Sequence, residues 1–492
     1  MRILVRAGRA FLAAAAISLA GVGLQAQTEG ETSHLLPSDH WAVEAAETIH
    51  ALGLTDDYFP TTNAVPAATV ARALREGAIA AEGGAMADVT GAWLRRWAEE
   101  LGGSIVPERR VVLGGSAGGG LSGHRGTARP GRNLLPLPED GPVRIPAAVD
   151  PQLFGSGWGA SRHVAAQVRP AIEPNGIRLE RAEITGGVGI VRASLARTGV
   201  GYARGIVASP AAPFDHAALS LARPARLPGF LGAVGPVTFH TFGGVLGDER
   251  HGDRPWLWGA RGAVRPHPRL TVAVNRAAML AGQENPTPAS AANLLNTLIG
   301  RHVGDLADQI VSVDARWRLP VPAPATLYME WGAEDSAGSF YNVPGMVFGL
   351  LIPALPALPE LSVGAEHAYF GHSRVTPDRI NPPWYRHRQF TGGWVVGERM
   401  LGHPLGGNGA ETAVYGRLTE PLTRIDVKGR AFLRDRRPEN LFSPQRAGRS
   451  IGGTTTVAWR PASGATLRLD LSADLGSGWR EGAGRAAFEL HF

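Results

Sequence analysis

The chain has 492 residues, no cysteine and a mean hydropathy of −0.05. The absence of cysteine excludes a disulfide framework, a thiolate metal site and a cysteine nucleophile. The net charge is +6 at pH 7, but no basic run is dense enough to follow a phosphate backbone, so we expect no nucleic-acid partner.

No interior stretch offers the roughly 20 uninterrupted apolar residues that a membrane-spanning helix needs. The best candidate, residues 346–361, is interrupted by three prolines. A chain of this composition can span a membrane only as a closed β-barrel, because an open sheet edge cannot face lipid.

The amino terminus has the pattern of a secretory signal peptide. Three arginines precede an apolar core at residues 10–20, and Leu24-Gln25-Ala26 forms a cleavage site. We therefore expect residues 1–26 to be removed, which leaves about three net positive charges on the mature chain. An uncleaved membrane anchor is the alternative, and the short apolar core disfavours it.

Residues 27–102 contain three segments with apolar residues at helical spacing. The first helix is expected to begin after Ser38, a candidate N-cap. The second is expected over 66–75, ended by Gly77, and the third over about 90–101. Three short amphipathic helices predict a small periplasmic bundle that lies beside a barrel or plugs it.

Residues 103–160 are rich in glycine, proline and arginine, and we expect a linker there with room for the first strand. Within it, the Gly114–Gly118 string around Ser116 resembles the nucleophile elbow of α/β-hydrolases. More glycines follow instead of a helix, and no alternation of helices and strands comes later. A serine hydrolase built on Ser116 is therefore the weakest functional hypothesis.

From residue 161 to the end, apolar and polar residues alternate with the period of two that is typical of strands. The clearest segments are 310–319, 327–334, 425–434 and 465–475. Their polar positions carry charges of both signs, as a wet lumen would, and lengths of about ten residues match a tilted bilayer crossing. The alternative is a soluble sandwich with the apolar side inward. We expect residues 161–492 to form the barrel.

The last nine residues, Gly484–Phe492, alternate in the same way and end on an aromatic residue. Terminal strands of this kind are typical of barrels in the bacterial outer membrane. The predicted fold is therefore an all-β transmembrane barrel of roughly 16 to 20 antiparallel strands, with an N-terminal helical bundle, located in the outer membrane.

Three glycine-rich and aromatic motifs lie between residues 381 and 411: Tyr385-Arg386-His387, Gly392-Gly393-Trp394 and the run Leu401–Gly409. These motifs resemble the Wzi family of capsule-assembly outer-membrane proteins. Segments 259–282 and 300–317 fit the same family. The resemblance covers most of the mature chain and is strongest over about 230–420.

The resemblance implies a monomeric barrel in outer-membrane lipid that works as a lectin and not as an enzyme, without cofactor or metal. Such proteins hold capsular or extracellular polysaccharide at the cell surface. Rings can stack on sugar faces, and arginine forks suit acidic sugars. The candidate polysaccharide-binding residues are Trp384, Tyr385, Arg386, His387, Arg388, His403 and Asn408.

Two other interpretations remain open from the sequence. The residues around Tyr385 can instead pack a lumen or a turn without touching a ligand. The whole chain can also be a porin that passes sugars or small anions through an arginine-lined lumen. The fifteen histidines are dispersed and form no recognisable metal motif.

Overall fold

The computed structural model describes most of the chain beyond residue 32. The described residues are 33–36, 40–59, 65–101, 111–126, 150–161, 163–173, 176–210, 213–247, 254–280, 282, 290–298, 303, 306–321, 324–334, 345–371, 384–387, 390, 392–396, 399–441, 446–462 and 464–492. The expected signal peptide, residues 1–26, lies outside them.

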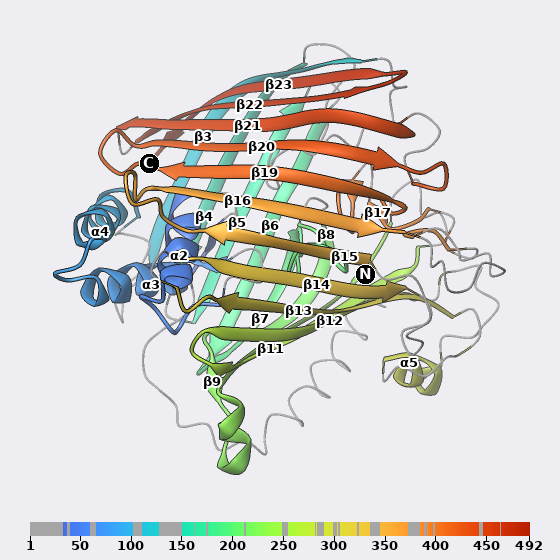
Figure 1. Ribbon diagram of the computed structural model, residues 1–492, viewed down its shortest axis with the longest axis horizontal. Helices are drawn as coiled ribbons and strands as arrows, with labels where there is room; N and C mark the ends of the chain where they lie inside the picture. The colour runs from blue at the N-terminus through green and yellow to red at the C-terminus, as the bar shows by residue number, and fades with distance from the viewer. Residues whose placement is uncertain are drawn as a thin grey trace.

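The architecture is one closed antiparallel β-barrel of eighteen strands, shown in Figure 1. Strands that follow one another along the chain are hydrogen-bonded neighbours, and the last strand closes the barrel on the first. A two-residue strand, β9 (Ala225–Arg226), additionally pairs with β10. The sequence-based prediction of an all-β barrel with 16 to 20 strands is confirmed.

The barrel strands have the following bounds. The first six are β3 (Val112–Gly126), β4 (Asp150–Ala160), β5 (Val164–Glu173), β6 (Gly176–Val188), β7 (Val191–Thr198) and β8 (Phe214–Leu221). The next seven are β10 (Pro236–Val245), β11 (Trp256–His267), β12 (Leu270–Leu280), β13 (Ala307–Arg318), β14 (Thr326–Glu334), β15 (Gly345–Ile352) and β16 (Leu361–Phe370). The last five are β19 (Gly409–Thr419), β20 (Ile425–Arg436), β21 (Gly448–Ala462), β22 (Ala465–Gly476) and β23 (Arg480–His491).

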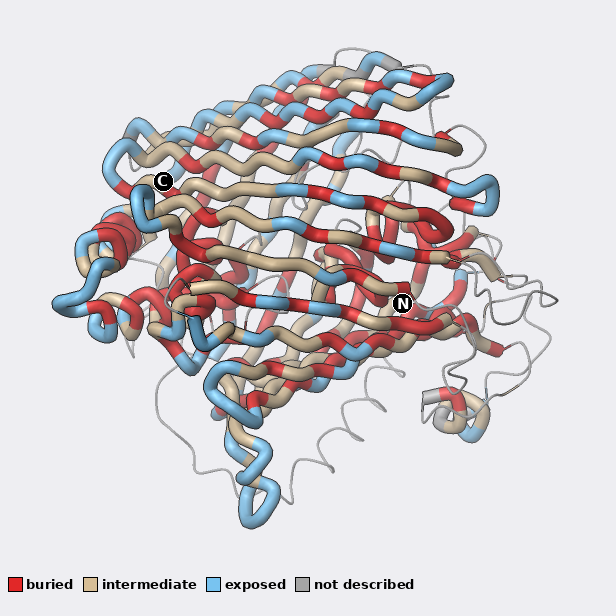
Figure 2. Tube along the Cα trace, in the orientation of Figure 1, coloured by how far each residue is buried: buried red, intermediate tan, exposed pale blue. Residues whose placement is uncertain are grey.

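The barrel wall is apolar outside and polar inside. In β22 the four alternating leucines are between 40% and 48% exposed, whereas Asp470 and Asp474 are each 1% exposed. Figure 2 shows the same alternation of exposed and buried positions along most strands. A soluble sandwich would bury the leucines and expose the aspartates, so that alternative is wrong.

The barrel begins earlier in the chain than the sequence pattern indicated. Strands β3 and β4 both lie within residues 103–160, where we expected a linker with room for one strand. Glycines hide the alternation of β3 because they make room for aromatic rings: a Cβ on Gly114 would lie 2.4 Å from the Trp158 ring. A strand whose inward positions are glycine carries no period-two signal.

Three helices form the predicted bundle: α2 (Trp41–Leu52), α3 (Ala67–Ala80) and α4 (Ala87–Leu101). The N-cap of α2 is His40, whose Nδ1 accepts the amide of Ala42, so the expectation for Ser38, which lies outside the described residues, is wrong. Helix α3 also continues past Gly77. That glycine allows α2 to approach closely, since a Cβ there would lie 2.5 Å from Ile49 Cγ2.

The remaining elements are small. Helices η2 (Gly229–Val234) and α5 (Ala291–Leu298) and the paired strands β17 (Val395–Val396) and β18 (Arg399–Met400) lie in connections between barrel strands. Strands β1 (Leu35–Leu36) and β2 (Val65–Pro66) pair with each other before the barrel begins. No helix within the described ranges combines the length and apolar character needed to cross a membrane.

The two ends of the barrel differ. In Figure 1 the carboxyl terminus and helices α2 to α4 lie together at one end, which we call the helical end. Connections that include α5 and β17 lie at the opposite end, which we call the loop end. The candidate binding residues all belong to the connection between β16 and β19, at the loop end.

Candidate functional site

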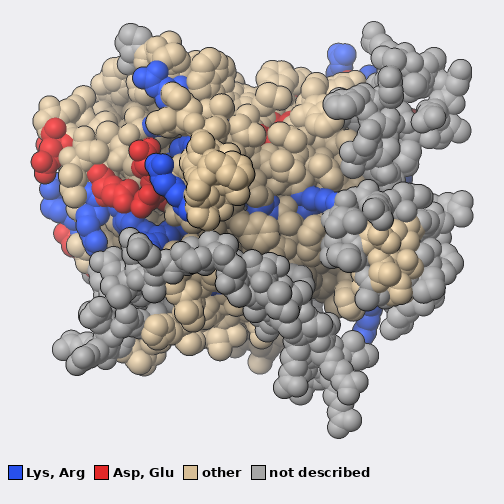
Figure 3. Space-filling model, turned by 90° about the horizontal axis from the view of Figure 1, so that it is seen from below, with Lys and Arg blue, Asp and Glu red and all other residues tan. Residues whose placement is uncertain are grey.

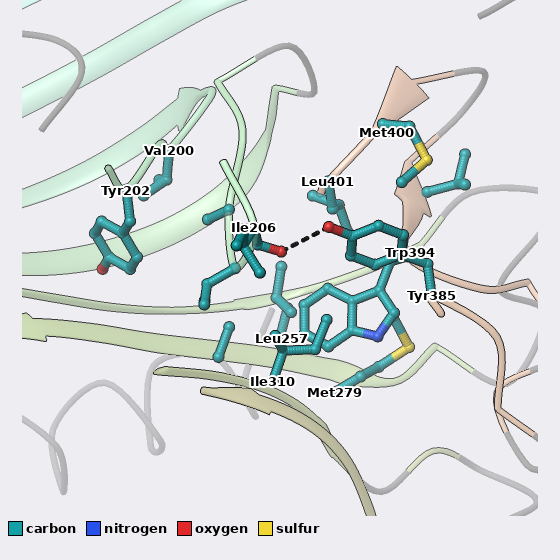
Figure 4. Packing of buried hydrophobic residues seen from close by; sticks show 14 of the residues in the cluster. Val200, Tyr202, Ile206, Leu257, Met279, Ile310, Tyr385, Trp394, Met400 and Leu401 are labelled. Atoms are coloured by element: carbon teal, nitrogen blue, oxygen red, sulfur yellow. Dashed lines mark hydrogen bonds between the residues drawn. The ribbon is translucent and has the colours of Figure 1, made fainter. Parts of the chain in front are cut away.

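A packed apolar cluster lies inside the barrel at the loop end. It combines the connection between β7 and β8 with the connection between β16 and β19, and both pack against wall strands (Figure 4). The buried members drawn there include Tyr202, Ile206, Leu257, Met279, Ile310, Tyr385, Trp394 and Leu401. We call the described residues of 199–210, 384–408 and 437–441 the plug.

Tyr385 lies at the centre of the plug and is fully buried. Its hydroxyl donates to the Ile206 carbonyl at 2.9 Å and accepts the His403 amide at 3.0 Å, which joins the two connections. Its own amide donates to the Glu334 carboxylate at 2.8 Å. Its φ of 67° is rare for a residue with a side chain, so these contacts hold a strained backbone.

The Leu401–Gly409 motif is shaped by the rings that it packs against. A Cβ on Gly402 would lie 2.3 Å from Cε1 of Tyr385. At Gly407 the φ is +88°, and a Cβ would lie 2.7 Å from the Trp384 carbonyl oxygen. Both positions therefore require glycine for close approach, and Gly407 also requires it for its left-handed backbone.

Two asparagines fasten this motif. Asn408 accepts the amide of Trp384 on Oδ1 at 2.8 Å, and both residues are buried. Asn440, from the connection between β20 and β21, donates its Nδ2 to the Leu405 carbonyl at 2.9 Å. The connection between β20 and β21 is therefore held to the Leu401–Gly409 motif through hydrogen bonds to backbone carbonyls.

His403 is buried and neutral at neutral pH. Its Nδ1 accepts the Leu405 amide at 3.2 Å, and its ring centroid lies 5.4 Å from that of Phe370. Burial lowers the pKa of His403 from 6.5 to about 4. The ring therefore acts as a hydrogen-bond acceptor inside the plug, and protonation would remove that acceptor.

The structure brings together six of the seven predicted residues, and Arg388 lies outside the described part of the chain. Trp384, Tyr385, His403 and Asn408 are buried. Arg386 and His387 keep partial exposure; Arg386 donates Nη2 to the Asn440 carbonyl at 3.0 Å. Sugar contact by any of these residues stays a prediction.

Charged side chains join the plug to the barrel wall. The amide of Arg204 donates to Glu330 at 2.8 Å, and its Nε donates to Glu366 at 2.6 Å. Glu366 also pairs with Arg430 at 3.0 Å. Burial alone would lower the pKa of Arg204, but the charge of Glu366 raises it well above its usual value, so the guanidinium stays charged.

At the helical end, a different set of contacts holds the helices to the barrel wall. Arg96 of α4 makes a two-pronged ion pair with Asp426 of β20, at 3.0 and 2.8 Å. The indole of Trp93 donates to the Thr419 carbonyl at 2.9 Å. Figure 3 shows charged side chains gathered at this end, with the barrel side largely uncharged. We call these contacts the bundle latch.

Sequence reasoning missed the partners that the plug uses. Glu330, Glu334 and Glu366 hold backbone and guanidinium groups of the connections. The sequence of β14 did contain a signal that could have identified these partners. Glu330 and Glu334 are four residues apart, so they share the inward face of the strand, and they are carboxylates in an otherwise apolar segment. Nothing local in the sequence indicates that residues 199–210 fold against them.

The Gly114–Gly118 string is not a nucleophile elbow. It lies inside strand β3, with no strand-to-helix turn. Ser116 Oγ lies 2.6 Å from Ser156 Oγ and also bonds to Glu489. Among the residues that the structure describes, no three histidine or acidic side chains are grouped to hold a metal ion.

Comparisons with known proteins extend this description. The Wzi barrel of Escherichia coli, described as a carbohydrate-binding β-barrel involved in group 1 capsule assembly, superposes with a TM-score of 0.70 at 15% identity. The match covers 93% of this chain and 99% of that one. OccK11 of Pseudomonas aeruginosa matches with a TM-score of 0.45 at 8% identity, over 78% and 96% of the two chains.

No curated protein sequence matches the chain. The profile of a family described as "Capsule assembly protein Wzi" matches residues 158–422, which is more than half of the chain. That range includes the plug segments before residue 423 and every candidate residue between 384 and 408. The chain therefore belongs to the Wzi family of capsule assembly proteins.

Proposed function

We propose that this protein is an outer-membrane barrel that binds capsular or extracellular polysaccharide and retains it at the cell surface. Family membership supports a role in capsule assembly. The barrel of the Escherichia coli relative, whose fold this chain shares, is described as carbohydrate-binding. The function is binding and not catalysis.

The observation that carries this proposal is that both ends of the lumen are occupied by packed structure. The plug packs inside the barrel at the loop end, and the bundle latch fixes the helices at the other end. We infer that a barrel with both ends occupied in this way works through its external surface and not through a wide channel. The porin alternative would instead need a continuous wet path past both obstacles.

We infer an orientation from the same features. Removal of residues 1–26 after export would place the mature chain, as a monomer, in the outer membrane. The helical end would face the periplasm, because the long connections of outer-membrane barrels usually face outward. The loop end would then meet the polysaccharide.

At that end, Arg386 and His387 are the candidates best placed for direct contact, because both keep partial exposure. A guanidinium can bind a sugar carboxylate through two parallel hydrogen bonds. The backbone that presents Arg386 and His387 would be fixed by the four buried candidates, Trp384, Tyr385, His403 and Asn408. Arg388 follows His387 directly in the sequence and is a further candidate for contact.

Binding of the host's purified polysaccharide to the purified protein tests the proposal. We expect Arg386→Ala to weaken binding at least fivefold. Arg449→Ala, which removes one positive charge from an exposed residue at the same end and outside the plug, is the matched control and should bind within about twofold of the native protein. Equal binding by all three proteins would remove Arg386 from the site. An absence of binding together with single-channel conductance in planar bilayers would favour the porin.

A further inference from the structure

A small cavity lies on the inner wall of the barrel, and none of residues 384–408, which include the candidate polysaccharide-binding residues, lines it. Gly199 and Val200 are the plug residues in its lining. The cavity has a volume of about 80 Å³ and lies between strands β7, β8 and β10 and the N-terminal segment around Tyr58 and Val65. One water needs roughly 10–15 Å³ on this measure, so the cavity has room for a small ion of several atoms. Its lining extends to Asp57, which is exposed at the helical end.

Four polar side chains converge on this cavity because of strand register. Arg192 of β7 is paired with Ser220 of β8, which is paired with His240 of β10. Ser194 lies two residues beyond Arg192 and therefore shares its face of the strand. All four line the cavity, so one guanidinium, two hydroxyls and an imidazole lie around one space.

Arg192 is the unusual member, because it is buried without a matching acceptor. It is 8% exposed, and neither its Nε nor its Nη1 has a hydrogen-bond partner among the described residues. Among the described residues, none forms an ion pair with Arg192 within 4 Å. Glu183 lines the same cavity, but its carboxylate bonds to Gln167 at 3.1 Å and its Oε1 has no partner either.

A buried guanidinium that makes no hydrogen bond and no close ion pair is unfavourable, because it has lost its hydration and gained little in return. The negative charge of Glu183 acts on Arg192 only from beyond ion-pair distance. The planar fork of an arginine matches the two oxygens of a carboxylate or phosphate. We propose that this cavity binds a small oxyanion, with the Arg192 guanidinium as the main ligand and the hydroxyls of Ser220 and Ser194 as further donors.

Thermal unfolding of the purified full-length protein in detergent tests the proposal. A ligand that binds only the folded state raises the unfolding midpoint with concentration. We expect inorganic phosphate or glucuronate, compared with chloride at equal ionic strength, to raise the midpoint of the native protein. In Arg192→Gln this rise should disappear. The rise should remain in Arg197→Gln, which alters an exposed ion pair with Asp215 on the same strand.

The two probes separate the possible sources of the anion. A response to glucuronate alone would indicate the carboxylate of an acidic sugar, and a response to phosphate alone would indicate a phosphate group. An identical midpoint in chloride and in both oxyanions would overturn the proposal, as would an undiminished rise in Arg192→Gln.

A second variant keeps the test valid if Arg192→Gln fails to fold. Glu183→Gln removes a negative charge from the cavity lining and should tighten oxyanion binding severalfold, because the repulsion between Glu183 and the anion is lost. Unchanged or weaker binding in Glu183→Gln would contradict the site. The oxyanion response should persist in Arg386→Ala, so failure of the polysaccharide proposal and failure of this one are distinguishable.

Discussion

The glycines of the Leu401–Gly409 segment serve close packing. Gly402 and Gly407 lie directly against Tyr385 and Trp384, where a methyl group has no space. The sequence showed a glycine-rich loop beside aromatic residues, and it correctly indicated that these residues belong together. It could not show that four of the seven candidates are buried, because burial depends on residues 199–210, which come from a distant part of the chain.

Gly402→Ala tests this packing. The added methyl group would lie 2.3 Å from the Tyr385 ring, so the plug must shift, at a cost of about 1–3 kcal/mol. Hydrogen exchange of the Leu401 and His403 amides, which bond to the Trp394 carbonyl and the Tyr385 hydroxyl, should become faster. Gly429→Ala is the control, because a methyl group there meets no atom within 4 Å. Equal exchange in both variants would show that the plug tolerates the methyl group.

His403 makes the plug sensitive to acid. Its pKa is about 4 in the folded protein and about 6.5 when unfolded. Between these values the unfolded chain binds a proton that the folded chain does not, so stability falls as the pH drops from 6.5 towards 4, by at most about 3 kcal/mol. His403→Asn, which keeps an acceptor and cannot be protonated in this range, should flatten that part of the stability–pH curve measured by thermal unfolding. His267→Asn, at an exposed position, should not flatten it.

Barrel strands could be predicted from the sequence where apolar and polar residues alternate along the whole strand. Strands β13, β14, β20 and β22 have alternating apolar and charged residues, and each was located from the sequence. Strand β3 was missed because its inward face includes Gly114 and Gly118, which face the rings of Trp158 and Phe154 on β4. The latch between α4 and β20 was also unpredictable, since Arg96 and Asp426 are 330 residues apart.

Arg96→Ala tests the latch. The substitution removes the two-pronged partner of Asp426, whose side chain is 6% exposed and which keeps an ion pair with Arg460. Loss of one member of a buried pair typically costs about 3–5 kcal/mol, and the remaining pair with Arg460 should keep the cost at or below the lower end of this range. Urea unfolding followed by tryptophan fluorescence should show the helical bundle unfolding earlier.

Arg424→Ala is the matched control, since its pair with Glu99 is more exposed and should contribute less than about 1 kcal/mol. If Arg96→Ala unfolds at the same urea concentration as Arg424→Ala, the buried pair does not fix the bundle.

At the scale of the molecule, the distribution of polar and apolar residues is the reverse of that in a soluble protein. The exterior is apolar, and the interior holds arginine–carboxylate pairs that link the wall, the plug and the bundle. Of the 49 basic residues only Lys428 is a lysine. Arginine suits this interior because it stays charged when buried and can bond two carboxylates at once.

Closure of the barrel depends on the carboxyl terminus. The Phe492 amide donates to the Gly115 carbonyl at 3.0 Å, and the Gly115 amide donates to the Phe492 carbonyl at 2.9 Å, beside the β23–β3 pairing. We expect deletion of Phe492 to lower the amount of protein that assembles in the outer membrane, measured by heat-modifiable migration on gels. Phe492→Trp, which keeps the pairing and an aromatic end, should assemble normally. Normal assembly without Phe492 would show that the terminal residue is dispensable.

The most direct test of the central claim is the distribution of polysaccharide in the host. The gene is deleted, and cell-bound and released polysaccharide are measured separately. The account predicts unchanged total synthesis, with most polysaccharide released into the medium, and restored attachment when the native gene is returned. Unchanged attachment in the deletion strain would contradict the proposed function.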